Sequence, residues 1–502
     1  MSDASRRERA PASASSDAGG MEAVIGLEIH VQLQTERKLF CPDSTRFGDA
    51  PNSNVCPVCL GLPGALPTVN GEAVELAVRA ALAFGCTVHE TSVFARKNYF
   101  YPDLPKGYQI SQFERPLATD GRFTVQSEEG EHEVRIRRIH MEEDAGKSLH
   151  DRFPRATAVD LNRAGTPLIE LVSEPDLRSP EEARGYLQQV KRVIEYLDVS
   201  DCNMEEGSLR VDANVSIRPR GVTTLGTKTE VKNMNSFSGV EKALTAEIRR
   251  QKEVVAQGGE VEHMTLLWDE VKGEVRPMRT KEESHDYRYF PEPDLPPLVI
   301  SSDRIEALRL ELPELPADRS RRFRVELDLP EYDAEVLTAS RALADYFEAV
   351  AKATGNAKRA SNWVMGPILA MMKEGNLGAE ELPVRPEVLV ELIELVEEGA
   401  VSQNVGKNVL RTMAETGDSA REIVQREGLT QVRDPEQLEG WVDEVLESHP
   451  EEVARFGEGE KRLRGFFMGE VMKRSKGKAD PGEVARLLAL KLEVSPDPRR
   501  SS

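Results

Sequence analysis

A proline-rich cluster at residues 291–297 is the feature that most restricts how this chain can fold. Proline has no backbone N–H and a fixed φ, so four prolines within seven residues cannot continue a helix or a central strand. Short β-like runs with Gly, Pro and Asn turns precede the cluster, whereas apolar residues recur at helical spacing after it. The cluster therefore predicts a boundary between a strand-rich domain at residues 21–298 and helical segments beyond it.

Length and composition predict further divisions. At roughly 150 residues per domain, a chain of 502 residues is expected to form two to four domains. A stretch with glycines and an asparagine at residues 398–406 interrupts the helical pattern, which predicts a helical domain at residues 299–400 and a helical tail at residues 401–502. Residues 1–20 are small, charged or polar and lack the apolar core of a signal peptide, so we expect a disordered tail there.

Capping residues in the sequence predict where three helices begin. Ser179-Pro180-Glu181-Glu182 combines a capping serine, a proline at the first helical position and the acidic residue of a capping box. Ser236 begins a similar helix, and Asp480 begins the last one. The helix after Ser179 is expected to bury one stripe, formed by Tyr186, Leu187, Val190, Val193, Ile194 and Leu197.

The net charge and the number of cysteines indicate which binding partners and which cell compartment to expect. With 66 Lys and Arg against 87 Asp and Glu, the net charge of −21 opposes nucleic-acid binding unless basic residues gather locally; a salt-rich cytoplasm is an alternative origin of the surplus. Five cysteines are few and odd in number, unlike those of a disulfide-stapled secreted protein. No apolar run approaches the ~20 residues that cross a bilayer. We therefore expect a soluble, cytoplasmic protein.

Glu28 and His30 lie two residues apart in the β-like run from Ala23 to Leu33. Residues two apart on a strand point to the same face, so this carboxylate and imidazole are expected to converge as metal ligands do. The alternative is an edge strand whose polar residues face water.

A second polar cluster, His140-Met141-Glu142-Glu143-Asp144, follows an apolar alternation that changes register after Arg137. On a strand, His140, Glu142 and Asp144 share one face, where like charges need a cation to neutralise them. The alternative is a solvated, charged turn. Basic residues that would suit phosphates beside a metal flank the cluster: Arg135, Arg137, Arg138 and Lys147.

A third charged run follows the acidic turn that holds Glu205. Arg210, Asp212 and Asn214 would share one strand face, and a cation next to a carboxylate can bind phosphate and metal together. A cross-strand salt bridge would give the same pattern.

A fourth run places Lys228, Glu230 and Lys232 on one face, and Lys228 or Lys232 could contact a γ-phosphate. The sequence contains neither a G-x-x-x-x-G-K-[ST] loop nor a dinucleotide-binding G-x-G-x-x-G after a strand. Any ATP must therefore be held by a sheet and by a metal, and oxygen ligands favour Mg²⁺.

The cysteines suggest a separate metal site. Cys56 and Cys59 form a C-x-x-C pair, and Cys41 lies fifteen positions before Cys56, as in zinc ribbons. Asp43 is a candidate fourth ligand. Buried cysteines without a metal are the alternative.

Two segments are candidates for binding nucleic acid. Residues 96–109 interleave basic and aromatic side chains, which suits stacking on unpaired bases, although a packed proline-containing loop has the same composition. The candidates there are Lys97, Tyr99, Tyr101 and Lys106. Residues 461–478 carry seven basic residues and one acidic residue, typical of a nucleic-acid-binding end or of a solvated helix face. The candidates there are Lys473, Arg474 and Lys476.

These motifs, in this order, resemble the B-subunit family of the aspartyl/glutamyl-tRNA amidotransferases. The resemblance spans nearly the whole chain after Met21. It is carried by Ile25-Gly26-Leu27-Glu28-Ile29-His30, by residues 51–67 with Cys-Leu-Gly-Leu-Pro-Gly, and by residues 97–112, 140–146, 160–168, 205–214, 230–237 and 280–296.

The resemblance implies an α+β catalytic domain of the glutamine synthetase/guanidino kinase type, then an all-α helical domain and a tRNA-binding tail. It implies that ATP phosphorylates the side-chain carboxylate of Glu-tRNA(Gln) or Asp-tRNA(Asn), and that ammonia then forms the amide. An amidase subunit supplies the ammonia, and a small third subunit, C, completes the heterotrimer.

The resemblance also assigns roles to the candidate residues. Glu28, His30, Glu142 and Glu143 are expected to hold Mg²⁺, with Asp212 and Glu205 supporting a second metal or a water. Lys232 and Arg210 are expected to contact phosphate. Zinc-binding members of the family often carry a fourth cysteine in a C-x-C pair, where this chain has Cys41-Pro42-Asp43.

Two other functions remain open on the sequence. One is a synthetase-like enzyme that phosphorylates a free small carboxylate, which would not depend on charged tRNA. The other is a non-catalytic tRNA-binding scaffold, which would not turn over ATP and would leave the acidic clusters unexplained.

Overall fold

The computed structural model describes residues 20–127, 130–278, 287–431, 434–475 and 477–494. Most of the predicted N-terminal tail (residues 1–19) and the candidate Lys476 lie outside these residues. The chain divides into two compact units, Met1–Leu315 and Pro316–Ser502.

A nine-stranded sheet forms the centre of the first unit, in the order β14-β13-β12-β11-β1-β10-β7-β6-β2. Neighbouring strands are antiparallel, except that β12 and β13 run parallel. The strands are β1 (Met21–Gln32), β2 (Thr87–Val88), β6 (Ala118–Ser127), β7 (Gly130–Glu143), β10 (Pro167–Ser173), β11 (Leu209–Pro219), β12 (Thr229–Lys232), β13 (Thr265–Asp269) and β14 (Glu274–Pro277).

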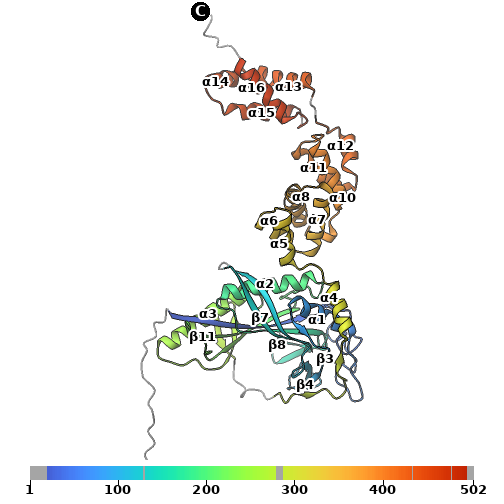
Figure 1. The fold of residues 1–502 in the computed structure, drawn as a ribbon, viewed down its shortest axis with the longest axis vertical. Helices are drawn as coiled ribbons and strands as arrows, with labels where there is room; N and C mark the ends of the chain where they lie inside the picture. Colours follow the sequence, from blue (N-terminus) through green and yellow to red (C-terminus); the bar gives the residue numbers. More distant parts are fainter. Residues whose placement is uncertain (1–19, 128–129, 279–286, 432–433, 476, 495–502) are drawn as a thin grey trace, which may run out of the picture. The chain divides into compact units, whose positions relative to one another are not determined.

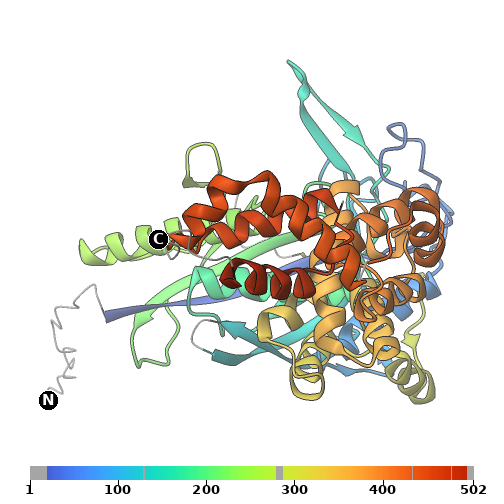
Figure 2. The ribbon, with the colours of Figure 1, turned by 90° about the horizontal axis from the view of Figure 1, so that it is seen from above.

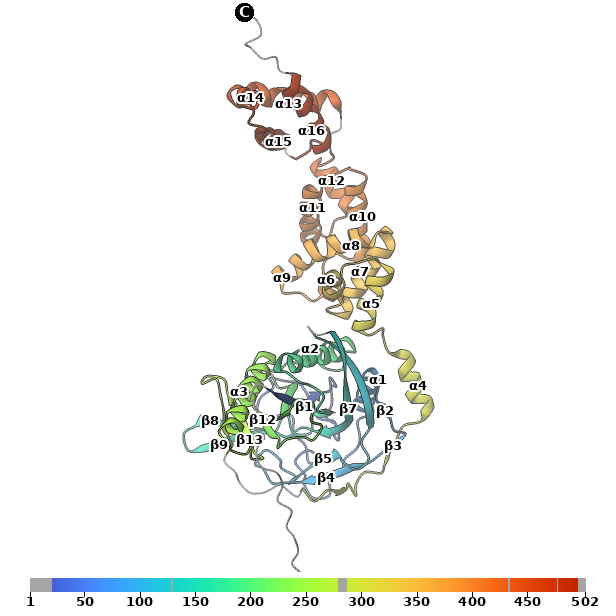
Figure 3. The same cartoon turned by 60° about the vertical axis from the view of Figure 1, so that its left-hand side comes forward.

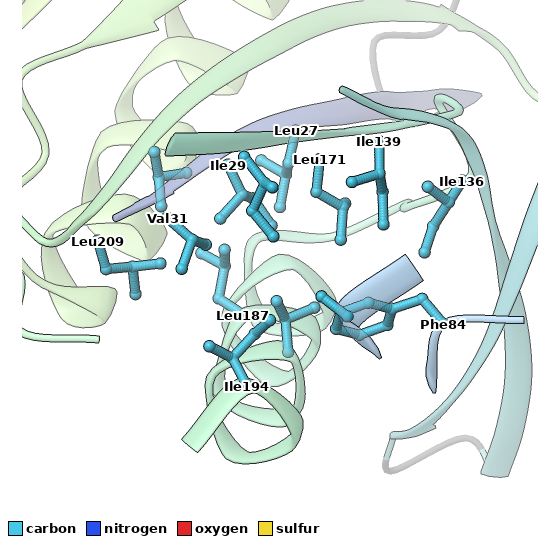
Figure 4. Packing of buried hydrophobic residues seen from close by; sticks show 14 of the residues in the cluster. Leu27, Ile29, Val31, Phe84, Ile136, Ile139, Leu171, Leu187, Ile194 and Leu209 are labelled. Carbon is cyan, nitrogen blue, oxygen red and sulfur yellow. The ribbon is translucent and has the colours of Figure 1, made fainter. Parts of the chain in front are cut away.

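Helices cover one face of this sheet and enclose the main core. Figure 4 shows side chains of β1, β7 and β10, such as Ile29 and Leu171, packed against Leu187 and Ile194 of α2. Every residue of the stripe predicted for this helix is buried. The helices of the unit are α1 (Gly71–Ala83), α2 (Pro180–Tyr196), α3 (Phe237–Ala256) and α4 (Ser302–Glu311).

The predicted helix starts are confirmed. The side chains of Ser179 and Ser236 accept hydrogen bonds from the first turns of α2 and α3. The capping box of α2 is only half formed, because the carboxylate of Glu182 accepts from the backbone N of Arg178, at 2.7 Å, instead of from the capping serine.

Smaller sheets lie elsewhere in the first unit. In Figures 1 and 3, α2 lies on one side of the large sheet and β4 on the other. In Figure 2, the β8–β9 hairpin projects from the body of the unit. The small sheets are β15-β4-β5 (Phe290–Pro291, Phe94–Asn98 and Tyr108–Gln112), β16-β3 (Leu298–Val299 and Thr91–Ser92) and β8-β9 (Lys147–Phe153 and Ala156–Asp160).

The proline-rich cluster lies inside the first unit. Glu292 forms a buried, two-pronged ion pair with Arg96, at 2.7 Å for each contact. After it, β16 pairs with β3 and α4 contacts α1, so this unit extends to Leu315. The prolines therefore end one edge strand without ending the unit.

The second unit is helical and contains two separate hydrophobic cores, at residues 323–424 and 438–492. In the stretch at residues 398–406, residues 398–402 form the turn between α10 and α11, and residues 403–406 begin α11. Both helices share the first core. The first group of helices is α5 (Pro316–Glu326), α6 (Glu331–Leu337), α7 (Arg341–Thr354), α8 (Ala357–Trp363), the π-helix η2 (Val364–Ile368), α9 (Leu369–Gly375), the 3₁₀ helix η3 (Ala379–Glu381), α10 (Pro386–Glu397), α11 (Gln403–Thr416) and α12 (Ala420–Glu427). The second group is α13 (Pro435–Ser448), α14 (Pro450–Gly457), α15 (Leu463–Arg474) and α16 (Pro481–Val494).

The fold class expected from the sequence is confirmed at the level of a mixed sheet with helices followed by a helical part. Asp480 caps α16 as predicted, accepting from the backbone N of Gly482 and Glu483. Within the described residues, no helix is both long enough and apolar enough to cross a membrane.

Candidate metal centres

Strand β1 carries the polar residues of the candidate site on the face opposite the core. Ile29 and Val31 are buried in the core, and Glu28 and His30 alternate with them. Antiparallel pairing places Glu170 of β10 beside His30 and Asp212 of β11 beside Glu28. Since β1 has a partner strand on each side, it is not the edge strand of the alternative interpretation.

His30, Glu142 and Glu170 form a first cluster, here called the His30 group. One ligand atom from each lies within 4.8 Å of the others. His30 Nε2 is 3.6 Å from Glu142 Oε1 and 3.5 Å from Glu170 Oε2. Three separate strands, β1, β7 and β10, therefore supply one possible ligand each.

A second histidine supports the His30 group. His140 Nε2 lies 3.3 Å from Glu170 and 3.7 Å from Glu142. Burial opposes its charge, but the charge of Glu170 and the hydrogen bond to Glu142 raise the pKa of His140 to about 9. His30 is similar, because the hydrogen bond to Glu170 outweighs burial and raises its pKa. Conversely, against burial, the two histidines hold the pKa of Glu170 well below its ordinary value. Against burial, the hydrogen bond to His140 also lowers the pKa of Glu142, so both carboxylates are ionised and can bind a cation.

Glu28, Asp212 and Glu230 form a second cluster, the Glu28 group, whose ligand atoms also lie within 4.8 Å of one another. Burial raises the pKa of Glu28, and the charges of Glu170 and Glu230 raise it further. Lys232 lies 2.6 Å from Asp212 and 2.9 Å from Glu230. One ammonium therefore offsets only part of the negative charge, and a bound cation would offset more.

Arg210 and Asp144 lie beside the His30 group. Arg210 faces His30 across the β1–β11 pair and makes a 2.8 Å ion pair with the buried Asp144. Asp144 also accepts a hydrogen bond from Gln32, at 2.9 Å. Burial opposes its charge, but Arg210 lowers the pKa of Asp144, so this acid is a fixed anion that orients the guanidinium.

Three candidates lie outside both groups. The carboxylate of Glu143 accepts from Lys106 and, at 2.9 Å, from the backbone N of Ile110. Glu205 is exposed in the turn before β11, and Lys228 is exposed just before β12. The structure therefore joins Glu28, His30, Glu142 and Asp212 with Lys232 and Arg210, and leaves these three aside.

The two groups suit hard cations. The Glu28 group offers only oxygen ligands, as Mg²⁺ prefers, and the His30 group adds one imidazole to two carboxylates. The negative charge of the Glu28 group is only partly balanced by Lys232, and a bound cation would neutralise the remainder.

Cys41, Asp43, Cys56 and Cys59 form a third cluster, the thiol group, with ligand atoms within 4.8 Å of one another. The thiols of Cys41 and Cys59 lie 3.5 and 3.2 Å from the carboxylate of Asp43. A hydrogen bond from Cys41 lowers the pKa of Cys59 to about 6, despite burial. Four ligand atoms this close together, including a carboxylate and a readily ionised thiol, fit a tetrahedral zinc site.

The candidates for tRNA binding differ in exposure. Tyr101 is exposed, but Lys106 is buried against Glu143. Lys97 Nζ lies 4.9 Å from the ring centre of Tyr287, and Tyr99 donates a 3.4 Å hydrogen bond to Gln109. On α15, Lys473 is largely exposed and lies 3.6 Å from Glu470, while Arg474 pairs with Glu444 at 2.5 Å.

Glu170 is the residue that the sequence analysis missed. It lies in the run Pro-Leu-Ile-Glu-Leu-Val-Ser of β10, where it is the only charged residue. A single acid within an apolar strand was the available signal. Its importance appears only when the pairing places it between His30 and His140.

Comparison with known proteins gives matches over nearly the whole chain. The family described as the GatB/GatE catalytic domain matches residues 23–306, and the GatB domain matches residues 345–492. The B subunit of the aspartyl/glutamyl-tRNA(Asn/Gln) amidotransferase from Chlorobium limicola is 52% identical, over 94% of this chain and 99% of its own length. The protein of the same name from Moorella thermoacetica is 53% identical, with the same coverage.

Proposed function

The chain belongs to the family of aspartyl/glutamyl-tRNA amidotransferase B subunits, and from this premise we propose that it is the subunit that activates the tRNA-borne carboxylate. It uses ATP to phosphorylate the side chain of Glu-tRNA(Gln) or Asp-tRNA(Asn). Ammonia from an amidase partner then displaces phosphate and forms Gln-tRNA(Gln) or Asn-tRNA(Asn).

The observation that carries this proposal is that the His30 group and the Glu28 group lie side by side, each with one residue on β1. A carboxylate resists attack by ammonia until one of its oxygens is made part of a leaving group, and phosphorylation does this. The reaction brings anionic ATP to an anionic side chain, so it needs concentrated positive charge. The His30 group and the Glu28 group would hold Mg²⁺, which supplies that charge when bound.

The chain's own cations complete the proposed division of labour. The sheet face that carries the His30 group and the Glu28 group is here called the acidic face. Lys232 of β12 and Arg210 of β11 lie beside these groups and are held there by Asp212 and Asp144. Both are suited to orient phosphate oxygens. Glu143, Glu205 and Lys228, which lie outside the groups, keep their roles only as predictions. The roles of Glu143 and Glu205 come from the family resemblance, and that of Lys228 comes from the strand pattern.

Further parts of the proposal rest on the family. We assign the catalytic domain, which reaches Leu315 in the structure, to the glutamine synthetase/guanidino kinase type. The helical core at residues 323–424 is assigned to the helical domain, and the core at residues 438–492 to the tRNA-binding tail. The partners are the amidase A subunit, the small C subunit and misacylated tRNA. Five free thiols among the described residues suit a cytoplasmic location.

The thiol group is proposed to hold structural zinc. The ligands would be Cys41, Cys56, Cys59 and Asp43, a set that departs from four cysteines. Metal analysis of the purified protein should find about one equivalent of zinc, and Cys56→Ser should lose it. Cys86→Ser, which changes a buried thiol outside the group, should retain it. Less than about a tenth of an equivalent in the wild type would contradict the site.

The test of the main proposal is Glu142→Ala in the reconstituted complex. Both ATP hydrolysis and amidation of misacylated tRNA should be lost, while Glu133→Ala, at an exposed position of the same strand, should retain both. If the variant keeps both activities, the assignment is wrong. Amidation or ATP turnover by the wild type without charged tRNA would favour the free-carboxylate enzyme, and no ATP turnover would favour the scaffold.

A further inference from the structure

An aromatic pocket of about 710 Å³ lies beside the acidic face, in the first unit. It is formed by the start of β4, the end of β5 and the segment Tyr287–Pro291. Its lining includes Val93, Ala95, Phe113, Arg115, Tyr289 and Phe290. The functional assignments made so far do not use this pocket.

Planar apolar surfaces dominate this pocket. The rings of Phe113 and Tyr289 stack with their centres 4.2 Å apart and their planes 5° from parallel. Tyr287 meets Tyr289 edge-on, with centres 6.1 Å apart. Phe113 and Phe290 remain 44% exposed, so the pocket presents aromatic surface that the fold leaves uncovered.

A cation adjoins the aromatic surface. Arg115 is an exposed lining residue next to the equally exposed Glu114, and among the described residues no ion pair joins Arg115 to an acidic side chain. A flat apolar surface next to an available guanidinium is the combination that binds a nucleobase and its phosphate.

The pocket lies next to the His30 group. Ser111, two residues before Phe113 in the chain, donates a 3.2 Å hydrogen bond to Glu142. Lys97, two residues after Ala95, lies 4.9 Å from the ring centre of Tyr287. Burial raises the pKa of Tyr289, the charge of Lys97 opposes this rise, and the charges of Glu142 and Glu170 add to it. This ring is therefore within electrostatic reach of the proposed metal ligands.

We infer that this pocket binds the adenine ring of an adenosine whose reacting group lies at the acidic face. The inference rests on the proposed function, in which both substrates carry such an adenosine: ATP, and the 3′-terminal nucleotide of the charged tRNA. The base stacks on the exposed outer face of the Phe113–Tyr289 pair, and Arg115 contacts a phosphate.

Photo-crosslinking of the wild-type complex distinguishes the two sources. One arm uses 8-azido-ATP, and the other uses tRNA that ends in 8-azidoadenosine. One of the probes should label the peptide that contains Phe113 or Tyr289, and the matching unmodified substrate should suppress this labelling. The probe that labels identifies the occupant.

Substitution gives an independent readout. Phe113→Ala should raise the KM of the identified substrate roughly tenfold and leave the KM of the other unchanged. Phe153→Ala removes an exposed aromatic ring from the β8–β9 hairpin and is the matched control.

The inference is overturned if neither probe labels the pocket while the wild type hydrolyses ATP and amidates tRNA, because the proposed function then stands without this subsite. It is also overturned if Phe113→Ala weakens assembly with the partner subunits and changes neither KM, since the pocket then receives a protein side chain. A wild-type complex without ATP turnover instead refutes the proposed function itself.

Discussion

Glu170 shows how much of this site depends on single residues. It touches His30 and His140 from the strand between them, so one carboxylate links the two histidines. Glu28 and His30 could be predicted to share a face because that follows from alternation along one strand. Glu170 could not, because its position depends on which strand pairs with β1, and sequence alternation carries no information about pairing.

Glu170→Gln should lower the rates of ATP hydrolysis and amidation together by roughly 100-fold or more. Mutating a residue that only hydrogen-bonds to a metal ligand already lowers metal affinity or activity by about 10- to 100-fold, and losing a ligand should cost more. Glu174→Gln, which changes an acid that pairs with Arg137 just beyond β10, should leave both rates unchanged. Rates can be measured with saturating Mg²⁺. If the Glu170→Gln protein is fully active, Glu170 is not a metal ligand and serves only to pair with the two histidines.

The raised pKa of His140 predicts that the free energy of unfolding of the metal-free protein depends on pH. Its folded-state pKa of about 9 lies above the ordinary value of 6.5, so the charged ring contributes stability that is fully present below pH 6.5 and is lost as the pH rises through about 9. The unfolding free energies of wild type and His140→Gln, measured with a chelator, should therefore differ most at low pH and converge toward pH 9. A difference that does not change with pH would contradict the charge assignment.

At the scale of elements, helix caps hold the layer beneath the acidic face. Ser236 accepts a 2.9 Å hydrogen bond from Gly239 at the start of α3, and α3 packs against β11, which carries Asp212 and Arg210. The position of these charges thus depends on a helix that touches neither metal group.

Ser236→Ala should lower the free energy of unfolding by about 1 kcal/mol, because it leaves a backbone donor of the first turn without its partner. Ser238→Ala, at an exposed position in the same turn, should change it by less than about 0.5 kcal/mol. Denaturant unfolding followed on the first unit's transition measures both. Equal effects of the two substitutions would mean that the cap is not stabilising.

The capping serines were predictable because a cap is a local motif that needs only neighbouring residues. The register change after Arg137 was predictable for the same reason, and the structure has it as an irregularity in the β7–β10 pairing. The order of the nine strands was not predictable, because it depends on contacts between residues far apart in the chain. The boundary predicted at the proline cluster lies too early in the chain. After the prolines, β16 pairs with β3 and α4 packs against α1, so both elements still belong to the first unit.

At the scale of the whole molecule, a net charge of −21 must coexist with tRNA binding. Basic residues concentrated on a small part of the surface resolve this conflict, because phosphate contacts are short-ranged at cellular salt. Lys473, which is 78% exposed on α15, is the candidate of this kind best placed to reach a phosphate.

Lys473→Ala should weaken tRNA binding and reduce the slope of log affinity against log salt by roughly 1, the value for one lost phosphate contact. Lys272→Ala removes an exposed lysine from the turn between β13 and β14 and should leave the slope unchanged. Filter binding across a salt series measures both. Identical slopes for wild type and Lys473→Ala would remove this lysine from the tRNA interface.

The most direct test of the central claim follows one oxygen atom. If the side-chain carboxylate is phosphorylated at the acidic face, one of its oxygens leaves with the phosphate when ammonia forms the amide. Misacylated tRNA labelled with ¹⁸O in the side-chain carboxylate should therefore give one ¹⁸O in the released phosphate for each amide, and Glu142→Ala should give neither product. Amide formed by the wild type without ¹⁸O in the phosphate would contradict the account.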